Sequence, residues 1–320
     1  MKKYPRVLTI AGSDSGGGAG IQADIKAISA TGSYAASAIT AVTVQNTLGV
    51  EAVHPVPTDI IAAQIRCVLS DIGADAIKIG MLHSAEVVLA VRDALLEFLE
   101  PNEVTCPGNQ ENVVPGVQNI VLDPVMVATS GHRLIEESAI EVLRSELLPL
   151  ARVITPNIPE AEILAGVRIT SQKDLPAVAR QLSESIAHSW KSRYSSYSSG
   201  GQSDLCNLPD CPRVSVLLKA GHLTEERLTD VFFNAENGTM LELPSERLHT
   251  PNTHGTGCTL SSALASYLAQ GLGLDDAARA ATDYIHQAIV SGAEYTIGHG
   301  HGPVDHFWSL RRNLQNADNQ

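Results

Sequence analysis

Short runs of apolar residues alternate along the chain with longer segments in which apolar residues recur at helical spacing. The first run, Arg6 to Ala11, ends at a glycine-rich segment, and Ile21, Ile25 and Ile28 then recur every three or four residues up to Gly32. This order predicts a strand, a loop and a helix. Because a strand that returns through a helix to a second strand forms a parallel pair, repetition of the order predicts a parallel sheet.

The alternation continues to the end of the chain, with no linker that would divide it. Further strands are predicted at Ala38 to Val44, Ala76 to Ile79, Ile120 to Asp123, Val153 to Thr155 and Val214 to Lys219. Further helices are predicted at Ile60 to Leu69, Val87 to Leu99 with Ser84 as its cap, Ile140 to Leu148, Leu175 to Ile186, Leu260 to Gln270 and Ala277 to Val290. We therefore predict a single α/β domain over residues 1–320, with a largely parallel central sheet and helices on both faces.

Two segments without an apolar period, Pro101 to Gln118 and Ser189 to Pro212, interrupt this series. Both are rich in Ser, Asn, Gly and Pro, and both are predicted to be surface loops inserted into the domain. The second contains Cys206 and Cys211, but no further Cys or His pair at zinc spacing lies nearby. A flexible insertion is therefore favoured over a metal or redox pair.

Composition narrows the classes of function. Lys plus Arg total 22 against 35 for Asp plus Glu, a formal charge of -13, which disfavours binding to nucleic acid or to an anionic membrane. No apolar run approaches the roughly 18 residues that a membrane helix needs, so we expect a soluble protein. The five cysteines are too few and too odd in number for a disulfide scaffold, which fits the reducing cytoplasm.

The run Asn252 to Cys258 immediately precedes a predicted helix. Its backbone amides at Gly255, Thr256, Gly257 and Cys258 would therefore point out of a helix N-terminus, where partial positive charge favours an anion. Such amides could stabilise the oxygens of a phosphoryl group during its transfer. An ordinary glycine-containing turn before a helix is the alternative.

Polar residues follow several predicted strands at their carboxyl ends, the edge where α/β proteins bind ligands. Asp123, Asn157 and Glu160 could supply the oxygen ligands that Mg²⁺ prefers. Glu160 could equally be a first-turn residue that opposes a helix dipole. Lys219 could face a nucleotide phosphate or remain a solvated cation.

The glycine run Gly16 to Gly20 matches neither of the two common nucleotide-binding signatures. No Gly-Lys-Ser/Thr follows it, so it is not a P-loop, and it lacks the glycine spacing of a dinucleotide-binding turn. A close-approach loop remains, with Asp14 before it and Asp24 one helical turn beyond. Asp24 could lie at a pocket wall or be solvated.

Two residues at strand ends could recognise a flat heterocycle. Gln45 carries both a donor and an acceptor, which match a pyrimidine ring nitrogen and an exocyclic amine. Met81 could cover the face of the ring, although core packing is the commoner fate of a methionine.

Six motifs follow one another from the first strand to near the C-terminus: Leu8 to Asp14, Gly17 to Asp24, Lys78 to Leu82, Leu122 to Met126, Thr155 to Glu160 and Asn252 to Thr259. Together they resemble the motifs of the bacterial hydroxymethylpyrimidine and phosphomethylpyrimidine kinases of thiamine biosynthesis, members of the ribokinase-like superfamily. Gly300 to Phe307 resembles the terminal motif of that family. Neither insertion overlaps any of these motifs.

The resemblance implies a ribokinase-like fold, a dimer, and phosphorylation by ATP first of the pyrimidine alcohol and then of its monophosphate. It also implies roles for individual residues. These are Gln45, Gly12, Asp24 and Met81 around the pyrimidine, Lys219, Asn157 and Thr253 in contact with ATP, and Glu160 and Asp123 with Mg²⁺.

Cys258 occupies the position at which the sugar kinases of the superfamily carry an aspartate base. A free thiol has a pKa of about 8.5, which a helix N-terminus and Mg²⁺ can lower, so a thiolate base is favoured. A thiol that only packs against the substrate is the alternative reading.

Two other functions stay open on the sequence. A pyridoxal-type kinase of the same superfamily would phosphorylate a hydroxymethyl group on a ring of similar size. A non-catalytic pyrimidine-binding module would keep the fold, but it would not need the anion loop and the Mg²⁺ residues that this chain retains.

Overall fold

The computed structural model describes residues 3–100, 102–106, 110–114, 116–127, 134–194 and 212–312. Within these ranges nine strands form one sheet in the order β11-β10-β9-β8-β7-β4-β1-β2-β3. The strands are β1 (Arg6–Asp14), β2 (Tyr34–Asn46), β3 (Gly49–Pro55), β4 (Ala76–Ile79), β7 (Ile120–Leu122), β8 (Val153–Ile154), β9 (Ser215–Leu218), β10 (Arg227–Phe233) and β11 (Met240–Glu246). The six central strands, from β9 to β2, are parallel to one another. The outer strands pair in antiparallel fashion with their neighbours, β3 with β2, β10 with β9 and β11 with β10.

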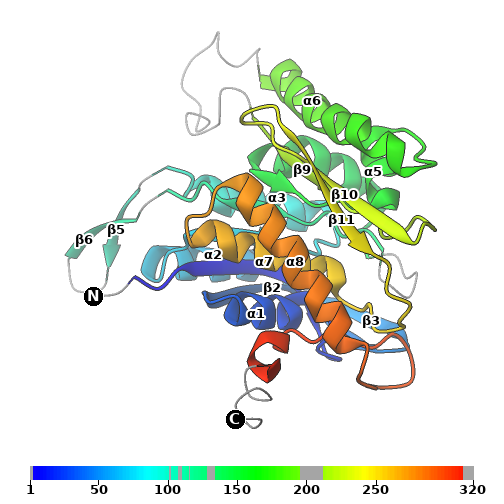
Figure 1. Ribbon diagram of the computed structural model, residues 1–320. Coiled ribbons are helices and arrows are strands. Elements are labelled where there is room, and N and C mark those ends of the chain that lie inside the picture. Colours follow the sequence, from blue (N-terminus) through cyan, green and yellow to red (C-terminus); the bar gives the residue numbers. More distant parts are fainter. Residues whose placement is uncertain are drawn as a thin grey trace.

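Helices cover both faces of the sheet (Figure 1). They are α1 (Gly20–Ala30), α2 (Thr58–Asp71), α3 (Ala85–Leu96), α4 (Glu137–Val142), α5 (Ile158–Ala165), α6 (Leu175–Tyr194), α7 (Thr256–Ala269) and α8 (Leu274–Gly292), with short π and 3-10 turns at Leu143–Leu147, Leu148–Leu150 and Gln172–Asp174. Neighbouring residues of a strand enter different cores: Val7 belongs to the core that includes residues of α1, α7 and α8, whereas Leu8 belongs to the core that includes residues of α2 to α6. The central strands are thus buried on both faces, which explains their uninterrupted apolar runs.

The predicted α/β class and the largely parallel sheet are confirmed, and every predicted central strand is present. The outer strands β3, β10 and β11 were not predicted. Along β11 most positions are at least partly exposed, so its polar and apolar residues do not form the buried run that marks a central strand. Helix α5 was missed because it is only eight residues long.

The predicted insertions need correction. Within 101–118 the chain forms an antiparallel pair, β5 (Asn102–Cys106) with β6 (Gln110–Val114), and not an irregular loop. Helix α6 continues to Tyr194, so residues 189–194 are helical. Cys206 and Cys211 lie outside the described residues. None of the described helices is both long enough and apolar enough to cross a membrane.

Candidate active site

A cavity of about 750 Å³ opens at the carboxyl ends of the parallel strands. Its wall is built from residues at the carboxyl ends of β1 and β2, from residues that follow β4, β7, β8 and β9, from parts of β10, β11 and α8, and from the loop before α7. The predicted site residues that line it are Gly12, Gln45, Met81, Asp123, Asn157, Glu160, Lys219, Thr253, Gly255, Thr256, Gly257 and Cys258. Asp24 is the exception among the predicted residues.

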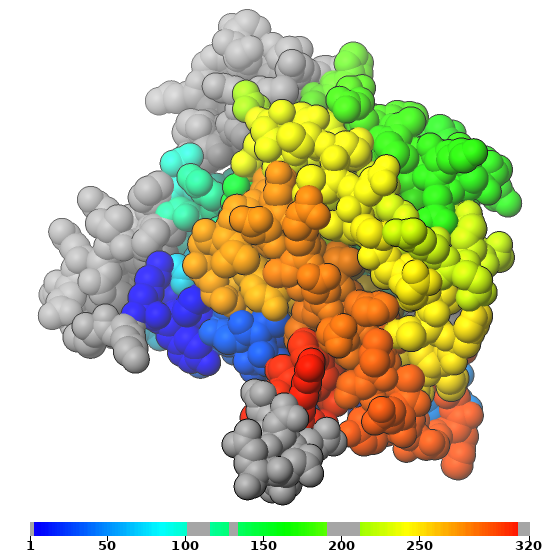
Figure 2. All heavy atoms as spheres, viewed as in Figure 1, coloured from blue at the N-terminus to red at the C-terminus, as the bar shows by residue number. Residues whose placement is uncertain are grey.

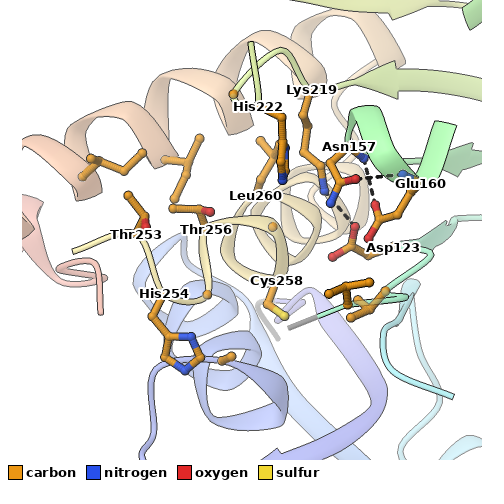
Figure 3. Close-up of a pocket in the computed structure, with 18 of the residues that line it drawn as sticks. Asp123, Asn157, Glu160, Lys219, His222, Thr253, His254, Thr256, Cys258 and Leu260 are labelled. Atoms are coloured by element: carbon orange, nitrogen blue, oxygen red, sulfur yellow. Dashed lines mark hydrogen bonds and ion pairs between the residues drawn. The ribbon is translucent and has the colours of Figure 1, made fainter. Parts of the chain in front are cut away.

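One end of the cavity carries a cluster of two carboxylates and a lysine (Figure 3). Lys219 Nζ lies 3.0 Å from Asp123 Oδ1, which also accepts a 2.9 Å hydrogen bond from Thr155 Oγ1. Burial and the nearby charge of Asp123 raise the pKa of Glu160 to about 7, against the effect of Lys219. When both carboxyl groups are ionised, the cluster carries two negative charges and one positive charge, so it can accept a further cation.

Asn157 and Glu160 form a reciprocal cap at the start of α5. Asn157 Oδ1 accepts the backbone N–H of Glu160 at 3.0 Å, and Glu160 Oε2 accepts the backbone N–H of Asn157 at 2.8 Å. The first-turn role considered for Glu160 is thus present. The cap also holds both side chains at the cavity wall, so it does not exclude a role with ligands.

The cluster fits Mg²⁺ as an ion shared with phosphates. Among the described residues no group of three or more His, Cys, Asp or Glu side chains is arranged to hold a metal by itself. Mg²⁺ typically keeps several waters and takes only one or two protein carboxylates beside substrate phosphates. Asp123 and Glu160 offer such carboxylates, and a bound cation would offset the mutual repulsion that raises the pKa of Glu160.

The loop before α7 presents the free end of a helix to the same cavity. Gly255 has φ 78° and lies so close to the carbonyl of Gly18 that a Cβ would overlap it, so glycine is required there. No side chain caps the helix at this end, which leaves first-turn amides available to a ligand. A Cβ at Gly257 would lie 3.2 Å from Lys219 Nζ, so this backbone borders the charged cluster.

The ionisation of Cys258 differs from the expectation. Burial raises the pKa of its thiol to about 11; Lys78 and a backbone hydrogen bond from Gly20 lower it, whereas Asp24 and Asp123 raise it further. Burial therefore outweighs the lowering of this pKa that was expected from the helix N-terminus.

Asp24 was predicted at the pyrimidine and instead lies fully buried behind the cavity wall. Its carboxylate accepts both contacts of Lys78 Nζ at 2.9 Å, the hydroxyl of Thr9 at 2.6 Å and that of Ser262 at 2.8 Å. The correction has a simple cause. Lys78 is an ammonium group in a fully buried strand, and it requires a counter-charge that Asp24 supplies.

The opposite end of the cavity holds a buried histidine that the sequence did not single out. His254 Nε2 lies 2.9 Å from Asp14 Oδ2, and Asp14 also accepts the backbone N–H groups of Gly16, Gly18 and Ala19. Although burial opposes ionisation, these bonds hold the pKa of Asp14 below its ordinary value. Asp14 thereby joins the glycine loop to the loop before α7.

Gln45 lies beside this histidine. Its Nε2 is 3.5 Å from His254 Nε2, and its Oε1 accepts a 3.1 Å hydrogen bond from Thr43 Oγ1. A Cβ at Gly12 would lie 3.3 Å from the terminal methyl of Met81, so the glycine leaves space beside that flexible side chain. The two ends of the cavity are thus an amide next to an apolar wall and a charged cluster. In Figure 3 Cys258 lies between His254 and the charged cluster.

A family model described as phosphomethylpyrimidine kinase matches residues 14–107, 109–190 and 203–305. The hydroxymethylpyrimidine/phosphomethylpyrimidine kinase of Rhizobium meliloti is 42% identical over 301 residues, covering 94% of this chain and 96% of its own. A crystal structure of phosphomethylpyrimidine kinase from Clostridium difficile is 36% identical with a TM-score of 0.66, covering 90% of this chain and all of its own. The ADP complex of Bacillus subtilis pyridoxal kinase is 31% identical with a TM-score of 0.74, covering 97% and 99%.

Proposed function

The chain belongs to the phosphomethylpyrimidine kinase family, and we propose that its cavity transfers phosphoryl groups from ATP to 4-amino-5-hydroxymethyl-2-methylpyrimidine and then to the monophosphate. It is a kinase of thiamine biosynthesis. The observation that carries the proposal is the placement of an uncapped helix N-terminus between the Asp123–Lys219 cluster and Gln45.

The pyrimidine would occupy the end of the cavity formed by Gln45, Met81 and Gly12. The side-chain amide of Gln45 supplies a donor and an acceptor to the ring edge, while Met81 contacts the ring face. Asp24 does not contact the substrate in this arrangement, because its oxygens are already occupied behind the wall.

ATP would place its phosphates between the first turn of α7 and the charged cluster. The amides of Gly255, Thr256 and Gly257 would bind the transferring group, and Lys219, Asn157 and Thr253 would contact the nucleotide. Asp123 and Glu160 would hold Mg²⁺. When bound, that ion neutralises phosphate charge as it develops.

Cys258 is proposed as the proton acceptor. The hydroxymethyl oxygen forms a bond to the γ-phosphorus, the bond from that phosphorus to the bridging oxygen of ADP breaks, and the hydroxyl proton passes to sulfur. This step requires the thiolate, which burial opposes and which Lys78 and the Gly20 amide favour. A thiol that only packs against the substrate remains the competing role.

Product analysis tests the proposal directly. The purified protein incubated with Mg²⁺, ATP and hydroxymethylpyrimidine should give monophosphate and then diphosphate, resolved by mass spectrometry. Pyridoxal is the matched competitor, since several similar structures are pyridoxal kinases. A preference for pyridoxal of ten-fold or more, or binding without turnover, would overturn the proposed substrate or the proposed catalysis.

The assembly and compartment are proposed more broadly. We expect one kinase domain over residues 1–320 that forms a homodimer in the cytoplasm and takes neither nucleic acid nor membrane as a partner. The net charge of -13 supports the last two points. Light scattering coupled to size exclusion measures the assembly, and a monomeric mass would contradict the dimer.

A further inference from the structure

The segment Gly300 to His306, here called the C-terminal strap, contacts both ends of the active site without lining its cavity. It follows α8 and passes between the N-terminal part of the chain and the α7–α8 region on the face seen in Figure 2.

The beginning of the strap is fixed to the pyrimidine end. The backbone N–H of His301 donates to the carbonyl of Thr47 at 2.8 Å, and that of Gly300 donates to Thr47 Oγ1 at 3.2 Å. Thr47 lies two residues after Gln45. A Cβ at Gly300 would overlap the Thr47 carbonyl, so any other residue must separate the strap from this turn.

The middle of the strap is fixed to the loop before α7, and its end is fixed to α7 itself. The carbonyl of Gly302 accepts the backbone N–H of His254 at 3.0 Å, directly before Gly255. His306 Nε2 lies 3.0 Å from the hydroxyl of Thr259, directly after Cys258. The strap therefore holds both sides of the first turn of α7.

His306 is itself held rigidly. Its carbonyl accepts the hydroxyl of Tyr284 at 2.7 Å, and the preceding Asp305 bonds through its backbone N–H to Ala288 and through its side chain to Ser291 of α8. Burial lowers the pKa of His306 to about 4, so its ring is neutral at working pH. A neutral, fixed ring can keep one hydrogen bond to Thr259 without attracting the phosphates.

We propose that the C-terminal strap is a positioning element for phosphoryl transfer, with Gly300 and His306 as positioning residues that set the distance between Gln45 and the first turn of α7. The inference rests on the proposed function. Because a displacement of about 1 Å at a reacting centre can cost about 10²-fold in rate, a small shift of the strap suffices to lower turnover.

Two pairs of variants test the strap. Gly300→Ala introduces the clash with Thr47, and Gly273→Ala is its matched control because a Cβ there meets no atom within 4 Å. His306→Leu removes the bond to Thr259, whereas His306→Gln retains a polar group within reach of it. We expect kcat to fall at least ten-fold in Gly300→Ala and His306→Leu, with the pyrimidine KM for His306→Leu within three-fold of the parent. Gly273→Ala should match the parent, and His306→Gln should recover most of the loss.

A second measurement does not depend on activity. Amide hydrogen exchange at Thr259, whose N–H donates to the Gly255 carbonyl, and at the following Leu260 should quicken at least ten-fold in Gly300→Ala and not in Gly273→Ala, although Gly300 itself bonds to Thr47 and not to α7. Unchanged exchange, or parent-like kcat in folded Gly300→Ala and His306→Leu, would overturn the proposal that the strap is a positioning element. If the exchange differs between the variants as expected but the parent phosphorylates no pyrimidine, the proposed function is contradicted and the positioning role of the strap is not. If His306→Leu fails to fold, Thr259→Val removes the same bond from the other side and carries the same expectation.

Discussion

Two lysine–aspartate pairs lie on neighbouring parts of this sheet, and their surroundings give them different tasks. Lys78 and Asp24 are both 0% exposed and 2.9 Å apart, closed off behind the cavity wall. Lys219 and Asp123 are 3.0 Å apart, but 15% of the Lys219 side chain is exposed at the cavity. No ligand can reach the first pair, whereas the Lys219 side chain of the second pair can contact a phosphate that enters the cavity. Chemically identical pairs thus serve the fold in one place and the site in the other.

Breaking the buried pair should have the largest effect on stability. Lys78→Met leaves the Asp24 carboxylate buried without its counter-charge, which typically costs about 3–5 kcal/mol of unfolding free energy. Urea denaturation measures the loss. The double variant Lys78→Met with Asp24→Asn should recover much of it, because no charge then remains buried; a single variant as stable as the parent would show that the pair is dispensable.

Breaking the pair at the cavity should affect turnover more than stability. Lys219→Met removes a cation from the phosphates, and we expect kcat to fall about 10²- to 10³-fold, as for loss of one charge-stabilising group. Its unfolding free energy should fall less than that of Lys78→Met. Steady-state kinetics and urea denaturation of both variants give the comparison, which fails if Lys219→Met loses stability but keeps its kcat.

The next largest effect is expected on kcat when the Cys258 thiol is replaced. Cys258→Ser should lower kcat at least 10²-fold with the pyrimidine affinity nearly kept, if sulfur accepts the proton. Because the pKa of the thiol is raised to about 11, the activity of the parent should increase with pH above neutrality, where more thiolate forms. Cys258→Asp should abolish that increase, since a carboxylate is already ionised. Near-normal turnover of Cys258→Ser would leave the thiol with a packing role only.

The smallest effect concerns the charge balance beside Lys219. The pKa of Glu160 is raised to about 7 in the fold, above the unfolded value of about 4.3, so the folded state binds the extra proton between these values. The contribution of Glu160 to stability should therefore decrease as pH rises from about 4.3 to about 7. Urea midpoints across this range should fall more in the parent than in Glu160→Gln, which keeps the acceptor of the α5 cap. Parallel curves would show that Glu160 does not titrate there.

Local patterns were sufficient for the strand ends and for the helix that begins after Gly255. A buried parallel strand needs a continuous apolar run, and the residue after it must lie at the carboxyl edge, so Asp123, Asn157 and Lys219 could be placed together from sequence. The same reasoning failed for Asp24. One helical turn of sequence does not reveal which face of α1 meets the buried Lys78.

The amino-acid sequence by itself determined the order of strands and helices, the glycine-bearing helix N-terminus and the family motifs, because each depends on neighbours a few residues apart. The tertiary structure alone decided that Asp24 is sealed beneath the site, that burial raises the pKa of the Cys258 thiol, and that residues 300–306 join Thr47 to α7. Burial and ionisation depend on every group that surrounds an atom. In this chain those groups come from distant segments, as with Gly300 and Thr47, which are 253 positions apart in the sequence.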